Sequence, residues 1–201
     1  MKDNYARIVR DNLGRLYAEL PKDLARNLPA GQDGKRFVFD AFGEKCVIEP
    51  ERITISGEEH SSVLGILVSL YALSASSDAC VLSPLKSFKE FPGSAPYAGA
   101  FAAHAERVLV PHVARIKERI QRVVEILKGG KAPSEAEGDF SFIVHPLPKI
   151  ALCYVFYEAD DDFPASAACL YSHNANRFLP VDGLADVGEY TSRKILKIIQ
   201  G

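Results

Sequence analysis

The sequence lacks the local signatures of several common enzyme and nucleotide sites. Both Gly-Lys pairs, at 34–35 and 130–131, have Pro29 and Glu125 where a phosphate-binding loop needs its first glycine. No G-x-G-x-x-G follows an expected strand, and neither G-x-S-x-G nor H-E-x-x-H occurs. The sequence therefore names no cofactor, and any site must be built from residues that are distant in the chain.

Net charge and long apolar runs are also lacking. With 24 basic and 26 acidic residues the formal charge is -2, so nothing draws the whole chain toward nucleic acid or an anionic membrane. The basic stretch 107–128 contains two glutamates and no aromatic residue on which bases could stack. The longest apolar run, 63–75, is shorter than the roughly 20 residues of a membrane span, and residues 1–5 are polar. We expect a cytoplasmic protein that binds neither nucleic acid nor membrane.

Cysteine is scarce and scattered. The four residues Cys46, Cys80, Cys153 and Cys169 form no C-x-x-C pair, and no histidine stands at zinc-finger spacing. We expect buried, reduced thiols and no metal site. A disulfide between Cys153 and Cys169 is conceivable if their strands pair.

The remaining pattern predicts an α+β fold. Apolar spacing indicates a first helix after Asp3 or Asn4, a short helical turn at 24–28, a helix pair at about 97–109 and 111–128, and a last helix from Asp182. The run 63–75 is apolar nearly all round, which predicts one central buried helix. Strands are expected at 36–40, 46–48 and 53–55, and again at 140–145, 150–157 and 167–171.

Strands that cluster in two groups, and do not alternate with helices, favour antiparallel sheets over a doubly wound parallel sheet. Since a chain of 201 residues fits one core, we expect residues 1–201 to form a single domain.

Two segments are unusual for a simple scaffold. The loop that carries Phe88, Phe91 and Tyr97 has enough rings either to plug a core edge or to line a ligand pocket, and the plug is the simpler interpretation. The strand at 140–145 begins after Asp139 and ends at His145, just before two prolines. Six strand residues separate Asp139 and His145 by about 20 Å, which excludes a direct dyad between them.

The ordered motifs of the chain resemble a known family. Gly138-Asp139-Phe140, Pro146-Leu147-Pro148, Phe163-Pro164-Ala165 and the stretch 179–184 are similar to the domain of unknown function numbered 3786, found in bacteria and archaea and often in anaerobes. The segments 67–73 and 88–101 also resemble the family, so the resemblance covers nearly the whole chain. Tyr157 stands where the family pattern favours a tryptophan.

The resemblance implies no established activity. Some members of that family carry an iron–sulfur domain like that of corrinoid proteins, which implies a role beside anaerobic one-carbon chemistry. This chain has no cluster-binding run of cysteines, so an iron–sulfur or corrinoid group would belong to a partner protein.

Two hypotheses follow from these observations. The first is a non-catalytic binding or accessory module whose ligand contacts include Phe88, Phe91, Tyr97, Asp139 and His145. The alternative is a small enzyme with an acid/base group at Asp139 or His145.

Overall fold

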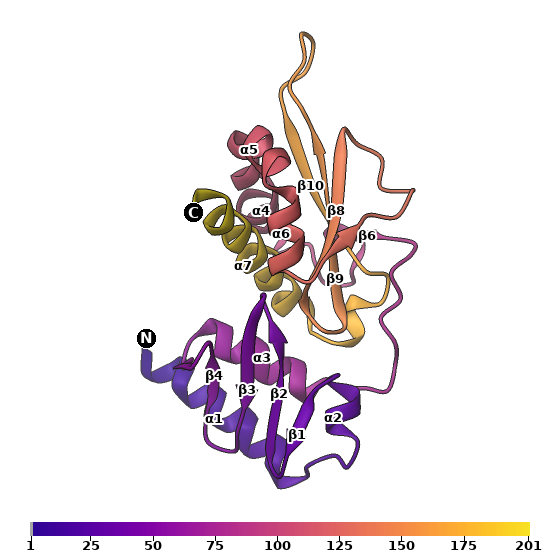
Figure 1. The fold of residues 1–201 in the computed structure, drawn as a ribbon. Helices are drawn as coiled ribbons and strands as arrows, with labels where there is room; N and C mark the ends of the chain where they lie inside the picture. Colours follow the sequence, from indigo (N-terminus) through magenta and orange to yellow (C-terminus); the bar gives the residue numbers. More distant parts are fainter. Residues whose placement is uncertain (1) are drawn as a thin grey trace.

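The computed structural model describes residues 2–201 and shows two lobes, each built on a five-stranded antiparallel sheet (Figure 1). The N-terminal lobe contains the elements from α1 to α3, and the C-terminal lobe contains those from β6 to α7. This α+β architecture, with two antiparallel sheets drawn from two strand clusters, confirms the expected fold class. That one domain covers the chain stays a prediction.

The N-terminal lobe is a meander with helices on one side. Its sheet has the order β1-β2-β3-β4-β5, so each strand pairs with its neighbour in the sequence. The helix α3 has no exposed residue, as expected for the predicted buried helix, and it packs along α1. The elements are α1 (Lys2–Ala18), α2 (Leu24–Asn27), β1 (Gly31–Asp33), β2 (Arg36–Ala41), β3 (Glu44–Ile48), β4 (Ile53–Ile55), β5 (Glu58–Glu59) and α3 (Val63–Leu73).

The C-terminal lobe carries its helices on one face of the sheet β6-β10-β9-β8-β7 (Figure 1). The central strand β9 is buried over all but its last residue, in agreement with its apolar sequence. Its strands are β6 (Lys86–Ser87), β7 (Gly130–Lys131), β8 (Phe140–Leu147), β9 (Ile150–Tyr157) and β10 (Ser166–Tyr171). Its α-helices are α4 (Ala98–Phe101), α5 (Val113–Glu118), α6 (Ile120–Ile126) and α7 (Val181–Gln200).

Two regular helices were expected at 97–109 and 111–128, and this prediction is wrong because neither segment is one continuous α-helix. Between α4 and α5 the chain forms a π-helix, Ala102–Glu106, and then a 3-10 helix, Arg107–His112. Pro111 lies inside the 3-10 segment, where it has no N–H to donate to a regular helix. A further break at Arg119 separates α5 from α6. Sequence spacing detects the apolar stripe but not these local changes of pitch.

Smaller differences concern strand number and element ends. The first sheet has five strands where three were expected, because the short edge strands β1 and β5 carry no apolar alternation. The first helix begins at Lys2, before Asp3 and Asn4, and the last begins at Val181.

One apolar core runs through both lobes. The buried cluster extends from Leu13 of α1 through Tyr71 of α3 to Phe156 of β9 and Ile195 of α7. α7 contacts α3, α4, α5 and α6, so it lies where the two lobes meet. Figure 1 shows α7 directly above the N-terminal sheet.

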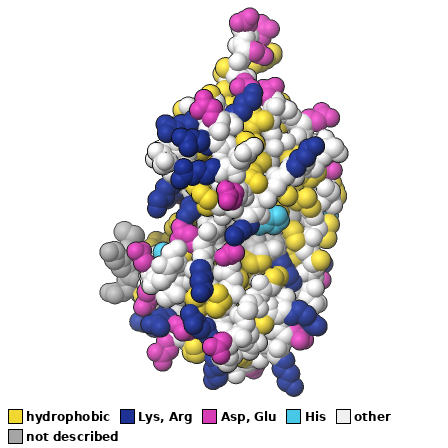
Figure 2. All heavy atoms as spheres, viewed as in Figure 1, with side chains coloured by type: hydrophobic (Ala, Val, Ile, Leu, Met, Phe, Trp, Pro, Cys, Tyr) yellow, Lys and Arg dark blue, Asp and Glu magenta, His cyan; other side chains and the backbone are white. Residues whose placement is uncertain are grey.

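The surface is unevenly charged. On the face in Figure 2, Lys and Arg side chains gather in the upper left of the view, and acidic side chains occupy the projecting tip above the sheet. That tip is the β9–β10 turn, in which Asp160 Oδ1 accepts the N–H groups of Asp162 and Phe163 at 2.9 and 2.7 Å. Within residues 2–201, no helix combines the length and apolar character needed to cross a membrane.

Candidate functional site

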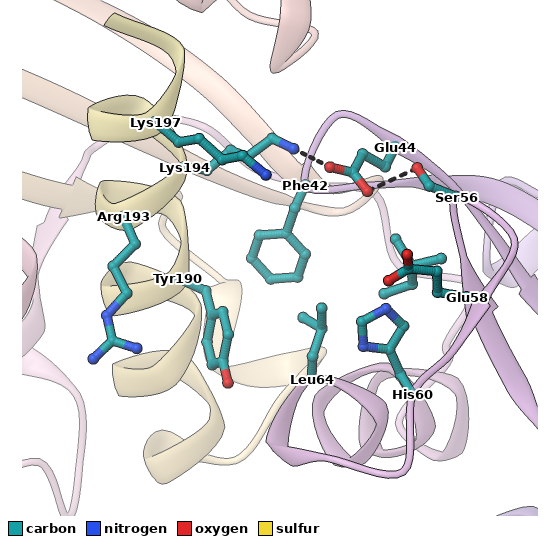
Figure 3. Close-up of a pocket in the computed structure, with 11 residues that line it drawn as sticks. Phe42, Glu44, Ser56, Glu58, His60, Leu64, Tyr190, Arg193, Lys194 and Lys197 are labelled. Carbon is teal, nitrogen blue, oxygen red and sulfur yellow. Dashed lines mark hydrogen bonds and ion pairs between the residues drawn. The ribbon is translucent and has the colours of Figure 1, made fainter. Parts of the chain in front are cut away.

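A cleft of about 570 Å³ lies where the turns of the N-terminal sheet face α7 (Figure 3). This volume is in the range of small-molecule pockets. Its lining combines rings, aliphatic groups and charges from both lobes. We call it the interlobe cleft, and its residues are Phe42, Glu44, Ile55, Ser56, Glu58, His60, Leu64, Tyr190, Arg193, Lys194 and Lys197.

The β2–β3 turn brings Phe42 to the centre of the cleft. Phe42 and Gly43 connect the strands with φ angles of 53° and 77°, the positive values that a tight two-residue hairpin requires. The N–H of Phe42 donates to the carbonyl of Pro146 in the other lobe at 2.7 Å. A Cβ on Gly43 would stand 2.4 Å from the carbonyl oxygen of Ile126, so only glycine permits this approach. The turn is therefore fixed against the C-terminal lobe.

The β4–β5 turn supplies a second hairpin end. Ser56 and Gly57 have φ angles of 52° and 84°, again the combination of a tight turn. The hydroxyl of Ser56 donates to Glu44 Oε2 at 2.7 Å. This bond joins the two turns and orients the Glu44 carboxylate.

Lys194 of α7 completes this arrangement by donating to the other carboxylate oxygen of Glu44 (Figure 3). The Lys194 side chain is 18% exposed and that of Glu44 is 33% exposed, so the ion pair is partly shielded from water. Burial raises the pKa of Glu44, but the hydrogen bonds from Lys194 and Ser56 outweigh it and the net pKa is lowered. Glu44 is thus an ionised link between the lobes.

The helix α7 presents four residues to the cleft at positions 190, 193, 194 and 197. Because these are spaced i, i+3, i+4 and i+7, they form one stripe along the helix. The Tyr190 ring lies 6.1 Å from that of Phe42, tilted by 56°. Burial, and then the charge of Asp186, raise the pKa of Tyr190, so its phenol stays protonated at neutral pH.

Leu64, Glu58 and His60 lie on the side opposite α7 (Figure 3). The N–H of His60 donates to the carbonyl of Ile53 at 2.9 Å, which fixes the chain between β5 and α3. The cleft thus has an apolar floor of Phe42, Leu64 and Tyr190. On one side of this floor lies the basic C-terminal half of α7, and on the other a carboxylate and an imidazole.

The aromatic residues predicted to contact a ligand do not meet at one surface. Phe88 and Phe91 are each 2% exposed and pack around Tyr171, at ring distances of 6.2 and 5.6 Å. Tyr97 is 38% exposed. The packing of the two phenylalanines matches the core plug, and the role of all three in ligand binding stays a prediction.

Asp139 directly precedes β8, and each of Asp139 and His145 has a local partner. His145 does not end the strand as expected, because β8 continues through Pro146 to Leu147. Asp139 Oδ2 accepts the N–H of Glu158 at 2.6 Å, which ties the start of β8 to the end of β9. His145 Nδ1 donates to the carbonyl of Lys128 at 2.9 Å. The register of β8 is irregular between Val144 and Leu147, where the carbonyl of Pro146 receives Phe42 from the other lobe. The acid/base alternative at Asp139 or His145 stays a prediction.

The cysteines are all free thiols. Burial raises the pKa of Cys46 and of Cys153 to about 12, so both are unreactive. A disulfide between Cys153 and Cys169 does not form, although their strands are neighbours. In the register of β9 and β10, Cys153 lies opposite Leu170 and Cys169 opposite Tyr154, which places the two thiols on opposite faces of the sheet. Among residues 2–201, no three His, Cys, Asp or Glu side chains gather to hold a metal ion.

Sequence reasoning missed the interlobe cleft because its residues come from 42–64 and 190–197. Two signals were present in the sequence. The first is that the pairs Phe42-Gly43 and Ser56-Gly57 each follow an apolar strand pattern and end in glycine. The second is a stripe beside the apolar face of the last helix, made of Tyr190, Arg193, Lys194 and Lys197. Neither signal indicates that these segments face one another.

Comparison with known proteins gives one family match. The model of a domain of unknown function (DUF3786) matches residues 21–194, which include every cleft residue except Lys197. No curated protein and no solved structure matches the chain.

Proposed function

Since the chain belongs to the family of the domain of unknown function 3786, whose description states no activity, we propose a function from its geometry. The protein is a non-catalytic accessory module that binds a small molecule in the interlobe cleft. One observation carries this proposal: a cavity of about 570 Å³, with an aromatic floor and charged sides, lies between the two lobes. Ligand sites are preferentially found at such junctions.

Backbone conformation supports the same location. Phe42 and Ser56 both line the cleft, and both have positive φ although neither is glycine. Such conformations cost about 1–3 kcal/mol and persist where the surrounding structure enforces them, often at binding sites. Here the enforcing contacts are the hydrogen bonds of the two turns to Pro146 and Glu44.

The state of Glu44 favours binding over catalysis. Both of its oxygens are occupied, by Ser56 and by Lys194, and its pKa is lowered. A general base at neutral pH needs a pKa near 7 and an oxygen directed at the substrate. Glu44 is therefore suited to holding the cleft together.

The family resemblance suggests the setting, which we include as part of the proposal. The module would act beside corrinoid or iron–sulfur one-carbon chemistry, with the metal group held by a partner protein. Native mass spectrometry of the protein, purified without oxygen from its source, tests this setting. A co-purifying corrinoid or iron–sulfur protein is expected, and a partner without either group would contradict it.

The cleft itself is tested by a fragment screen with two-dimensional ¹H–¹⁵N NMR. Bound fragments are expected to shift the amide signals of 56–60 and 190–197. Leu64→Trp, which fills the cleft, should abolish these shifts. Val81→Trp is the control, because Val81 is 45% exposed and does not line the cleft. Fragments that bind only elsewhere, or that bind the Leu64→Trp variant equally well, would contradict the proposal.

A further inference from the structure

The positive charges on the α7 side of the cleft are unequally paired. Arg193 contacts Glu189 at 2.5 Å, and Lys194 pairs with Glu44. Lys197 also lines the cleft, but it takes part in none of the ion pairs found among the described residues. Its ammonium group is therefore available to a ligand.

Lys197 lies close enough to act on the same carboxylate as Lys194. The charges of both lysines lower the pKa of Glu44, against the effect of its burial. Figure 3 shows the two side chains extending from α7 above the Phe42 ring. Two ammonium groups and one carboxylate leave one positive charge in excess at this corner, beside an apolar surface.

The other carboxylate of the cleft does not cancel this excess. Glu58 lies on the opposite side of the cleft from α7 and forms no ion pair with Lys197 among the described residues. Glu44 attracts a cationic ligand only weakly, because the ammonium group of Lys194 already balances its charge. The corner near Lys197 thus favours an anionic group over a cationic one.

The floor of the cleft defines the rest of the ligand. Phe42 and Tyr190 form a tilted ring pair, and Leu64 lies beside them. Aromatic rings pack on one another at centroid distances of about 4.5–7 Å. A planar or branched apolar body fits this surface, next to the positive corner.

From this arrangement we infer that the cleft selects a small organic acid, a carboxylate or phosphate attached to an aromatic or apolar body, and that Lys197 binds its acid group. This inference rests on the proposed function, since it names the ligand class of the same cleft. Lys194 contributes charge but is held by Glu44, and Lys197 supplies the free donor.

The test compares matched probes by NMR titration at low salt. Phenylacetate and 2-phenylethanol have similar bodies, but only phenylacetate is charged. A hydrogen bond to a charged group is worth enough for about tenfold tighter binding of the acid. Lys197→Gln should reduce the acid to the affinity of the alcohol and leave the alcohol unchanged. Lys45→Gln, at an exposed position outside the cleft, is the control.

Phenyl phosphate and inorganic phosphate complete the design. Phenyl phosphate against phenylacetate shows which acid group the corner prefers, and either preference agrees with the inference. Inorganic phosphate should bind more weakly than phenyl phosphate, because it lacks the apolar body. Equal binding of these two would overturn the role of the floor.

Equal affinity of phenylacetate and 2-phenylethanol, or an unchanged affinity in Lys197→Gln, would overturn the inference. If the alcohol binds in the cleft as well as the acid, the proposed function stands and only the ligand class is wrong. If neither probe shifts the cleft amides at millimolar concentration, the inference is overturned, and the fragment screen then decides the proposed function. An unchanged amide spectrum of free Lys197→Gln verifies that this variant is folded.

Discussion

At the scale of single residues, buried hydroxyl groups connect α7 to the C-terminal sheet. Ser192 donates to the carbonyl of Ala105 at 2.6 Å and lies 3.0 Å from the hydroxyl of Tyr154. All of these groups are buried, so removal of the serine hydroxyl takes one hydrogen bond from each of two buried polar groups. Ala105 belongs to the π-helix, in which the N–H of Arg107 bonds five residues back to Ala102.

We therefore expect Ser192→Ala to lower the free energy of unfolding by about 2 kcal/mol. The neighbouring Thr191 is the matched control. It is equally buried, but its hydroxyl bonds only to Val187 within the same helix. Thr191→Val should cost ~1 kcal/mol at most. Urea denaturation measures the free energy of unfolding of both variants. An equal decrease in the two would show that the hydrogen bonds of Ser192 to Tyr154 and Ala105 stabilise the protein no more than the bond of Thr191 within its own helix.

Glu44 provides a pH-dependent contribution to stability. Its folded-state pKa is lowered below 4.5, despite the opposing effect of burial, by Lys194 and Ser56. The stabilisation is therefore fully present above pH 4.5 and is lost as the pH falls through the folded-state value. Glu44→Gln should cost about 1 kcal/mol at pH 7, and this difference should vanish in acid.

Thermal unfolding between pH 7 and pH 3 measures this effect. Glu125→Gln is the control, since Glu125 is exposed and takes part in none of the ion pairs of the described residues. A constant difference between wild type and Glu44→Gln across this pH range would contradict the assigned role.

At the scale of elements, the β2–β3 and β4–β5 hairpins are a natural comparison. Both have a two-residue turn that ends in glycine, at Gly43 and Gly57, with φ angles of 77° and 84°. Only Gly43 touches the other lobe, because a Cβ there would meet the carbonyl of Ile126 at 2.4 Å. A Cβ on Gly57 would have no atom within 4 Å.

Gly57→Ala should therefore cost only the backbone strain of a positive φ, about 1 kcal/mol. Gly43→Ala should cost about 3 kcal/mol, since the contact between the lobes must also shift. Chemical denaturation gives the comparison. Similar losses in the two variants would show that the close approach to Ile126 does not limit this turn.

At the scale of the whole molecule, the two lobes share one apolar core and are also joined by a hydrogen bond and an ion pair. Residues of both lobes belong to the core cluster, among them Leu13, Tyr71, Phe156 and Ile195. The hydrogen bond runs from the N–H of Phe42 to the carbonyl of Pro146, and the ion pair is that of Glu44 with Lys194. A continuous core of this kind favours one cooperative unfolding unit.

Native-state hydrogen exchange can test this cooperativity. The slowest amides of β3 and of β9 should give the same free energy of opening, equal to that of global unfolding. If β3 exchanges through a lower-energy opening while β9 stays protected, the lobes are separate folding units. The prediction of a single domain for residues 1–201 would then be wrong.

The sequence by itself determined the class of fold and the identity of most core elements. Apolar periodicity is a local property, so the buried helix α3, the apolar strand β9 and the stripe of α7 could be predicted from neighbouring residues. The same locality explains the errors, since the π-helix and the edge strands β1 and β5 depend on partners outside their own segments.

Only the tertiary structure showed where the candidate site lies. The sequence predicted site residues at Asp139 and His145, because both are polar and stand beside a strand or a proline. In the structure their hydrogen bonds join neighbouring elements of the fold. The interlobe cleft requires Phe42, Glu44 and Lys197 to converge from segments about 150 residues apart, the sequence separation of Glu44 and Lys194. That convergence depends on how the two sheets pack around α7, which no local spacing of residues encodes.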